Sequence, residues 1–195
     1  MQAILSMCTN ATISALLLIP IFWLFCRKYF HDVKHILWYF VFAVYLSGVY
    51  AVAGLPDICY IRFDPNINLK PFAYMFSDYD ASLLNVLLFI PLGIFLPCLW
   101  QYFRKLLNGL LFGFCMSLLV EALQIFSYRS TDINDLMTNT LGTVLGWCVG
   151  QIILRCFPGI EPSTKTTDLW IICGTVFCVM FVAHPFLSKF LLSFT

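Results

Sequence analysis

The stretch SLLVEALQIFSYRSTDINDLMTNTLGTVLG, residues 117–146, joins two long apolar runs through a short polar turn. The turn and its flanks contain Glu121, Gln124, Arg129, Asp132, Asp135 and Asn139. Over the whole chain of 195 residues, 61% are hydrophobic and only 11% are charged. These proportions lie far from those of soluble globular domains, so the sequence indicates an integral membrane protein.

Six apolar segments have, or nearly have, the length of about 20 residues that a helix needs to cross a bilayer. They cover residues 3–26, 36–55, 83–103, 106–127, 135–157 and 169–192. The first lacks the basic region of a cleavable signal peptide, and His184, Pro185 and Lys189 interrupt the second half of the last. We therefore predict an all-α transmembrane helical bundle with five to six spans. Neither a repeat nor a Gly/Ser linker divides the chain, so we expect a single transmembrane domain over residues 1–195.

The basic residues between the spans predict the orientation, because Lys and Arg are enriched in cytoplasmic loops. Seven lie on one side of the predicted membrane, namely Arg27, Lys28, Lys34, Arg104, Lys105, Arg155 and Lys165. Four lie on the other side, namely Arg62, Lys70, Arg129 and Lys189. The bias predicts that both termini, the 56–82 loop and the 128–134 turn are external.

Small residues recur every four positions on the two spans that flank the polar turn. The fourth predicted span carries Gly109, Gly113, Ser117 and then Glu121, and the fifth carries Asp135, Asn139, Gly142, Gly146 and Gly150. Small side chains let transmembrane helices approach closely, and the short turn makes these two spans antiparallel neighbours. We therefore predict that the two small-residue faces pack on each other. The third predicted span has Asn85, Phe89 and Gly93 on one face, with the polar residue at the outer end.

Polar groups from three predicted spans therefore meet at one location in the outer leaflet. Glu121 is the strongest candidate, because an ionisable side chain below the membrane surface is costly unless it is protonated or paired, here with Arg129. We expect a ligand-binding site made of Asn85, Glu121, Gln124, Arg129, Asp132, Asp135 and Asn139.

Structural roles stay open for most of these residues. Thr131 or Asp132 suits a helix N-cap, and Asp135 suits the first turn of a helix, where the dipole favours an acidic side chain. Arg129 can extend toward lipid phosphates. Asn85 and Asn139 can form hydrogen bonds between helices.

Composition also disfavours several other kinds of site. The nine cysteines lie mostly inside apolar runs and form no CxxC motif. We therefore expect neither a disulfide framework nor a metal site. The formal net charge of +1 comes without a basic tail, so we expect no nucleic-acid partner.

Two segments, NVLLFIPLGIFLP at residues 85–97 and GLLFGFCMSLLVEALQIFSYRSTDINDLMTNTLGTVLG at residues 109–146, resemble the VanZ-like family. The family pattern has an Asn ahead of Phe-x-Pro-x-Gly, then Glu-x-x-Gln, an Arg, Asp-x-x-Asp and Asn-x-x-Gly. The matching residues are Asn85, Phe89, Pro91, Gly93, Glu121, Gln124, Arg129, Asp132, Asp135, Asn139 and Gly142. The resemblance covers about residues 40–155 and implies a multi-pass protein of the bacterial cell membrane that is connected with low-level teicoplanin resistance. It implies no particular reaction.

The polar site is compatible with three functions. The first is binding of a membrane lipid head group or a lipid-linked cell-wall precursor, or exclusion of the acyl tail of a lipoglycopeptide antibiotic, and it needs no cofactor. The second is a membrane-embedded hydrolase or transferase that uses Glu121, Asp132 and Asp135 for acid–base catalysis, or to hold Mg²⁺ against a diphosphate. The third is a lipid transporter, which the lack of an inverted sequence repeat disfavours.

Overall fold

The computed structural model describes residues 13, 16–24, 33–63, 65–72, 79–127 and 129–192. Within these ranges the chain is mostly helical, and five helices are long and apolar enough to cross a membrane. The predicted all-α transmembrane bundle is therefore confirmed. Most of the first predicted span, residues 3–26, lies outside the described residues, apart from a helical piece at 16–24.

The chain divides into two compact units. One consists of Met1–Arg62 and Thr167–Thr195, and the other is Phe63–Thr166. That the two together form one transmembrane domain stays a prediction. All residues of the predicted ligand site belong to the Phe63–Thr166 unit.

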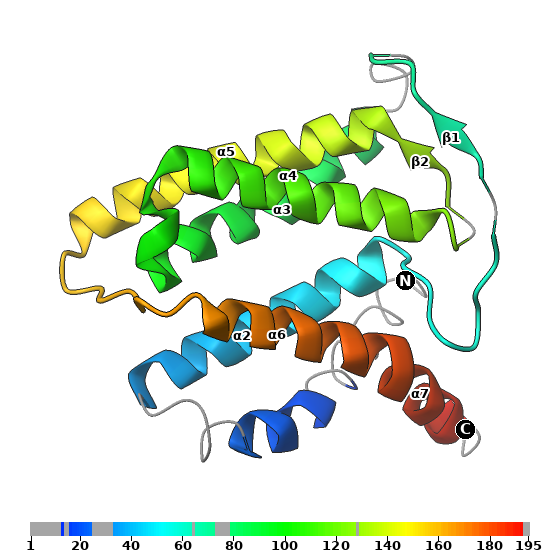
Figure 1. Cartoon of the computed structure of the whole chain (residues 1–195), viewed down its shortest axis with the longest axis horizontal. Helices are drawn as coiled ribbons and strands as arrows, with labels where there is room; N and C mark the ends of the chain where they lie inside the picture. Colours follow the sequence, from blue (N-terminus) through cyan, green and yellow to red (C-terminus); the bar gives the residue numbers. More distant parts are fainter. Residues whose placement is uncertain are drawn as a thin grey trace. The chain divides into compact units, whose positions relative to one another are not determined.

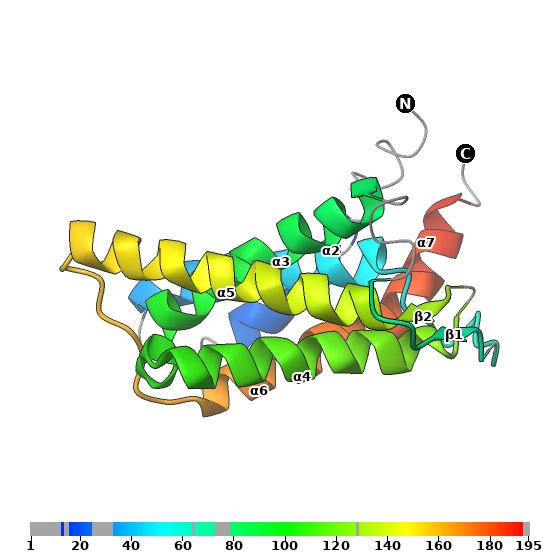
Figure 2. The same cartoon turned by 90° about the horizontal axis from the view of Figure 1, so that it is seen from above.

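Three long helices make up most of the Phe63–Thr166 unit, and they lie side by side in Figures 1 and 2. They are α3 (Tyr79–Leu99), α4 (Leu106–Gln124) and α5 (Ile133–Cys156), and a 3₁₀ turn at Gln101–Arg104 links the first two. Between α4 and α5 lies the short strand β2 (Thr131–Asp132), which pairs in parallel with β1 (Ile67–Asn68). Strand β1 is therefore held at the end of the unit where α4 ends and α5 begins.

Helices α3 and α5 are in direct backbone contact. A Cβ atom added to Gly146 would overlap the Ile90 carbonyl oxygen and lie 3.0 Å from the Cα atom of Gly93. The same stripe of α5 places Gly142 against Val86, and Gly150 against Ile94 and Pro97. Because residue numbers rise together along both helices, α3 and α5 run parallel.

The prediction that the two small-residue faces pack on each other is wrong for α5. Its glycines face α3 instead, because Gly93 lets the backbone of α3 approach the backbone of α5. The small face of α4 packs on a neighbouring face of α5. Gly109 lies against Trp147, Gly113 against Thr143, and Ser117 against Asn139. These pairs run in opposite order along the two chains, so the predicted antiparallel contact of the two helices is confirmed.

In the other unit, α2 (Val33–Val52) packs on α6 (Thr167–Cys178). Gly54, with φ 62°, follows the end of α2 in the left-handed conformation that favours glycine. A π-helical turn (Val179–Ala183) joins α6 to α7 (His184–Leu192), so the last predicted span is one helical path with an altered turn. Single π turns are often found at functional sites.

Candidate functional site

Glu121 lies in the last turn of α4 and is buried, with only 4% of its surface exposed. Its Oε2 atom accepts a hydrogen bond from the Asp132 backbone N–H at 2.9 Å. Its backbone carbonyl accepts a second one from the Thr131 hydroxyl, also at 2.9 Å. A buried carboxylate costs several kcal/mol unless it is hydrogen-bonded, so the bond to Oε2 offsets part of that cost. Glu121 therefore ties the end of α4 to β2 and the start of α5.

Asp132 is the N-cap of α5, as the structural interpretation of its position predicted. Its Oδ1 atom accepts a hydrogen bond from the Asn134 backbone N–H at 2.8 Å. Its Oδ2 atom accepts another from the side-chain amide of Asn68 at 3.0 Å. Both carboxylate oxygens are therefore already engaged by the protein, one by α5 and one by β1.

Asn134 also forms a hydrogen bond at this end of the unit, although the sequence did not indicate it as a site residue. It is buried, and its Oδ1 atom accepts a hydrogen bond from the Phe72 backbone N–H at 2.7 Å. Phe72 has φ 60°, which is uncommon for a residue other than glycine, so this bond stabilises an unusual backbone conformation. The only signal in the sequence was the polar side chain of Asn134, which lies between those of Asp132 and Asp135 along the chain.

Asn139 lies about two turns deeper along α5 than the N-cap, at the contact with α4. It is buried, and its Nδ2 atom donates a hydrogen bond to the Ser117 hydroxyl at 3.0 Å. The predicted hydrogen bond between helices is therefore present. The Oδ1 atom of the same side chain is also buried but accepts no hydrogen bond from any residue that the structure describes. An unsatisfied buried acceptor costs about 1–3 kcal/mol. A hydrogen-bond donor that reached Oδ1 of Asn139 would therefore gain from this unsatisfied atom.

Gln124 and Arg129 lie at the end of α4 and in the turn that follows it. Gln124 is buried, and its backbone carbonyl accepts a hydrogen bond from the Ser127 hydroxyl at 3.1 Å. Arg129 is exposed, and among the described residues no ion pair joins it to Glu121. The expected pairing is therefore absent, and the partner of the Glu121 carboxylate is the backbone N–H of Asp132. The Arg129 guanidinium is left at the surface of this end of the unit.

Asp135 and Asn85 complete the predicted set. Asp135 is half-buried in the first turn of α5, where the helix dipole favours a carboxylate. Asn85 is half-buried on α3, and the contact of Val86 with Gly142 puts it near the level of Asn139. The structure thus brings the predicted residues to one end of the three helices.

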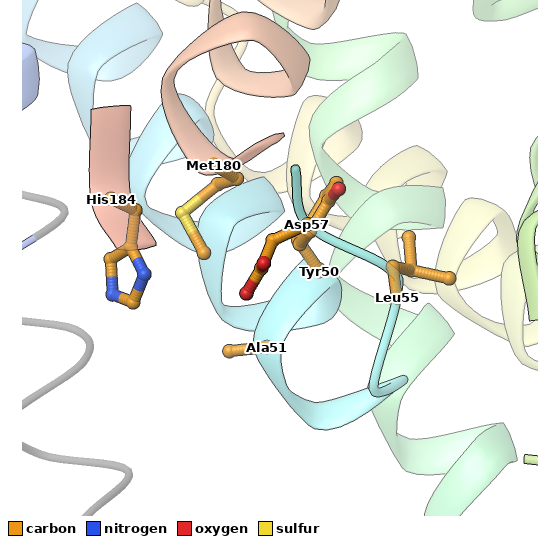
Figure 3. Close-up of a pocket in the computed structure, with 6 residues that line it drawn as sticks. All are labelled: Tyr50, Ala51, Leu55, Asp57, Met180 and His184. Atoms are coloured by element: carbon orange, nitrogen blue, oxygen red, sulfur yellow. The ribbon is translucent and has the colours of Figure 1, made fainter. Parts of the chain in front are cut away.

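The other unit contains a cavity that the sequence reasoning did not predict (Figure 3). Its volume is about 120 Å³, and it is lined by Tyr50, Ala51, Leu55, Asp57, Met180 and His184. The Met180 side chain lies between those of His184 and Asp57 in Figure 3. Backbone N–H groups of Cys59 and Tyr60 donate to Oδ1 of Asp57 at 2.8 and 3.0 Å, which fixes its carboxylate. The only sequence signal was the interruption of the last span at His184 and Pro185.

Comparison with known proteins gives the chain a family. The VanZ/LLP1 family model matches residues 36–154, close to the 40–155 core expected from the sequence. Protein VanZ of Enterococcus faecium is 36% identical over 84 residues, which cover 42% of this chain and 50% of that protein. The chain therefore spans about half the length of this curated relative. No solved structure matches the chain. Because the family model covers more than half of its residues, this multi-pass membrane protein belongs to the VanZ/LLP1 family.

Proposed function

We propose that this protein binds a membrane lipid head group or a lipid-linked cell-envelope precursor at the end of α3, α4 and α5 that carries Glu121. Binding at the cell exterior would lower susceptibility to teicoplanin-type lipoglycopeptides, as the resemblance to VanZ-like proteins suggests. The observation that carries the proposal is the buried Oδ1 atom of Asn139, which accepts no hydrogen bond from a described residue.

The chemistry of this end suits such a ligand. A hydroxyl or amide N–H of a head group would satisfy Oδ1 of Asn139, since that atom is an acceptor. The exposed guanidinium of Arg129 can form charge-assisted hydrogen bonds with a phosphate or diphosphate. Exposed apolar side chains on the neighbouring helices offer a surface for an acyl or prenyl chain, namely Leu83, Leu84, Leu87, Leu118 and Leu119.

Binding agrees better than catalysis with the hydrogen bonds of the carboxylates. Both oxygens of Asp132 accept hydrogen bonds that hold α5 and β1. Oε2 of Glu121 accepts the N–H of Asp132. Proton transfer to a substrate would compete with these structural bonds, whereas the proposed binding would use Oδ1 of Asn139 and the guanidinium of Arg129, which take part in none of them.

Antibiotic susceptibility of cells that express the protein tests the proposal. Arg129→Ala and Asn139→Leu should each abolish at least half of the wild-type decrease in teicoplanin susceptibility, at equal protein levels in the membrane. Arg155→Ala is the matched control, because Arg155 is also exposed but lies in the last turn of α5, at the opposite end. A glycopeptide without an acyl chain tests whether the effect depends on the lipid tail. Wild-type behaviour of both site variants would contradict the proposed site.

A further inference from the structure

The segment around β1, residues 65–72, exposes an unusual number of large apolar side chains for a connecting segment. Together with the preceding Phe63, the exposed fractions are 67% for Phe63, 45% for Ile67, 70% for Leu69 and 58% for Phe72. Large apolar side chains that gather on the surface in this way are a feature of protein or membrane contacts. The sequence alone identified these residues only as part of a connecting loop.

Hydrogen bonds attach this segment to the end of the three helices. The Thr131 N–H donates to the Asn66 carbonyl at 3.0 Å, and the Asn68 amide donates to Asp132 at 3.0 Å. The Phe72 N–H donates to Asn134 at 2.7 Å. The segment is therefore fixed at the level where α4 ends and α5 begins.

That level corresponds to the boundary between hydrocarbon and water. Helix α4 has 19 residues, which at 1.5 Å per residue is about the thickness of the hydrocarbon core. A helix of this length that crosses the bilayer therefore has its end at the membrane interface. The ring of Phe63 contacts the ring of Phe126, just past α4, with 5.9 Å between centroids. Both rings are exposed, so Phe63 enlarges the exposed apolar surface that Phe126 forms just past the end of α4.

Side chains alternate along the segment in a way that suits a position on the bilayer. Ile67 and Leu69 are exposed, whereas Asn68 between them is half-buried against Asp132. This is the alternation of an extended strand with one apolar face and one face toward the protein. Lys70 follows and is exposed, so its ammonium can reach lipid phosphates.

We infer that residues 65–72 and Phe63 form an interfacial anchor that inserts Ile67, Leu69 and Phe72 into the head-group and acyl boundary of one phospholipid leaflet. Aromatic and aliphatic side chains at this depth stabilise the position of a membrane protein. The polar residues Asp132 and Asn134 serve, on this account, to hold the anchor on the helix ends. The inference does not rest on the proposed ligand binding, and it holds for either orientation in the membrane.

Photo-crosslinking in nanodiscs of phosphatidylglycerol and phosphatidylethanolamine tests the anchor. The residue p-benzoylphenylalanine replaces Leu69, and in separate variants Ile67, Leu111 or Gly159. Leu111 is the positive control, because it is 52% exposed on α4. Gly159 is the control outside the spanning helices, because it is exposed in a connecting turn with no atom within 4 Å of its Cβ position. Intact-mass analysis after irradiation measures the yield of lipid adducts.

The anchor predicts a yield at residues 67 and 69 of at least half that at residue 111, and several-fold above that at residue 159. Yields at both positions equal to that at residue 159 would overturn it. An adduct with the mass of two chains, in place of lipid adducts, would also overturn it, because a second copy would then cover the segment. Leu69 is exposed, so its replacement should not disturb the fold. Size-exclusion chromatography checks that each variant is folded before its adduct yield is compared.

Discussion

Replacing Gly146 by alanine tests the backbone contact of α3 and α5, on which the shape of the predicted site depends. The added methyl group would overlap the Ile90 carbonyl oxygen and lie 2.8 Å from its carbon. It would also lie 3.0 Å from the Cα atom of Gly93. These are backbone atoms of a helix, so they cannot move aside as the end of a flexible side chain can. The two helices must instead separate.

The size of the effect follows from this separation. A carbon atom normally approaches a carbonyl oxygen to about 3.3–3.6 Å, so the helices must move apart by roughly 1 Å or more. A gap of that size removes about a quarter to a half of the dispersion energy for the atoms along it. Overpacking typically costs about 1–3 kcal/mol, and we expect about 3 kcal/mol here because the gap extends along a whole helix pair. For a chain of this length that corresponds to a decrease in Tm on the order of 10 °C.

Thermal unfolding of the purified protein in detergent, followed by tryptophan fluorescence at one scan rate, measures this decrease. Gly174→Ala is the matched control, because Gly174 is an exposed glycine of α6 with no atom within 4 Å of its Cβ position. Alanine there should leave Tm unchanged or raise it slightly, since alanine favours the helix over glycine. A Gly146→Ala protein that melts within about 2 °C of wild type would refute the close α3–α5 contact.

Three further predictions concern the end of the unit that carries Glu121. A cysteine at Ser130 should react with a membrane-impermeant thiol reagent added outside cells, and labelling only after permeabilisation would reverse the predicted orientation. Asp132→Ala should lower the free energy of unfolding by about 1 kcal/mol or more, whereas Asp132→Ser should retain most of the cap; equal melting of the two would argue against capping. Asn139→Leu should change the free energy of unfolding by less than about 1 kcal/mol. It removes an unsatisfied acceptor, and the Ser117 hydroxyl can donate instead to a backbone carbonyl of its own helix. A large destabilisation would instead assign Asn139 a structural role.

The sequence predicted the helices well, because crossing a bilayer imposes a length and an apolar composition that are visible residue by residue. The fourth predicted span, 106–127, is helical from Leu106 to Gln124, and the fifth, 135–157, from Ile133 to Cys156. The helix that packs on the α5 glycines could not be predicted from length and composition. A stripe of small residues fits any helix that brings its backbone close, and only the structure shows that Gly93 gives α3 this property.

The composition of the predicted site was visible in the sequence, but most of its internal bonds were not. Periodicity places Glu121 on an interhelical face, and it is indeed buried. Its partner is the backbone N–H of Asp132 in β2. A strand of two residues is too short for its sequence pattern to predict where this N–H points. The bond from Asn68 to Asp132 joins residues 64 positions apart, and pairing of β1 with β2 cannot be read from two-residue strands.

Direct ligand binding shows whether Arg129 and Asn139 hold a lipid-linked molecule. Native mass spectrometry of the purified protein, titrated with a polyprenyl diphosphate, compares wild type with Arg129→Ala, Asn139→Leu and the control Arg155→Ala. We expect one bound molecule per chain, with an affinity at least tenfold weaker in both site variants and unchanged in the control. Equal affinity of wild type and Asn139→Leu, or no binding of the polyprenyl diphosphate or of a phospholipid above background, would contradict it.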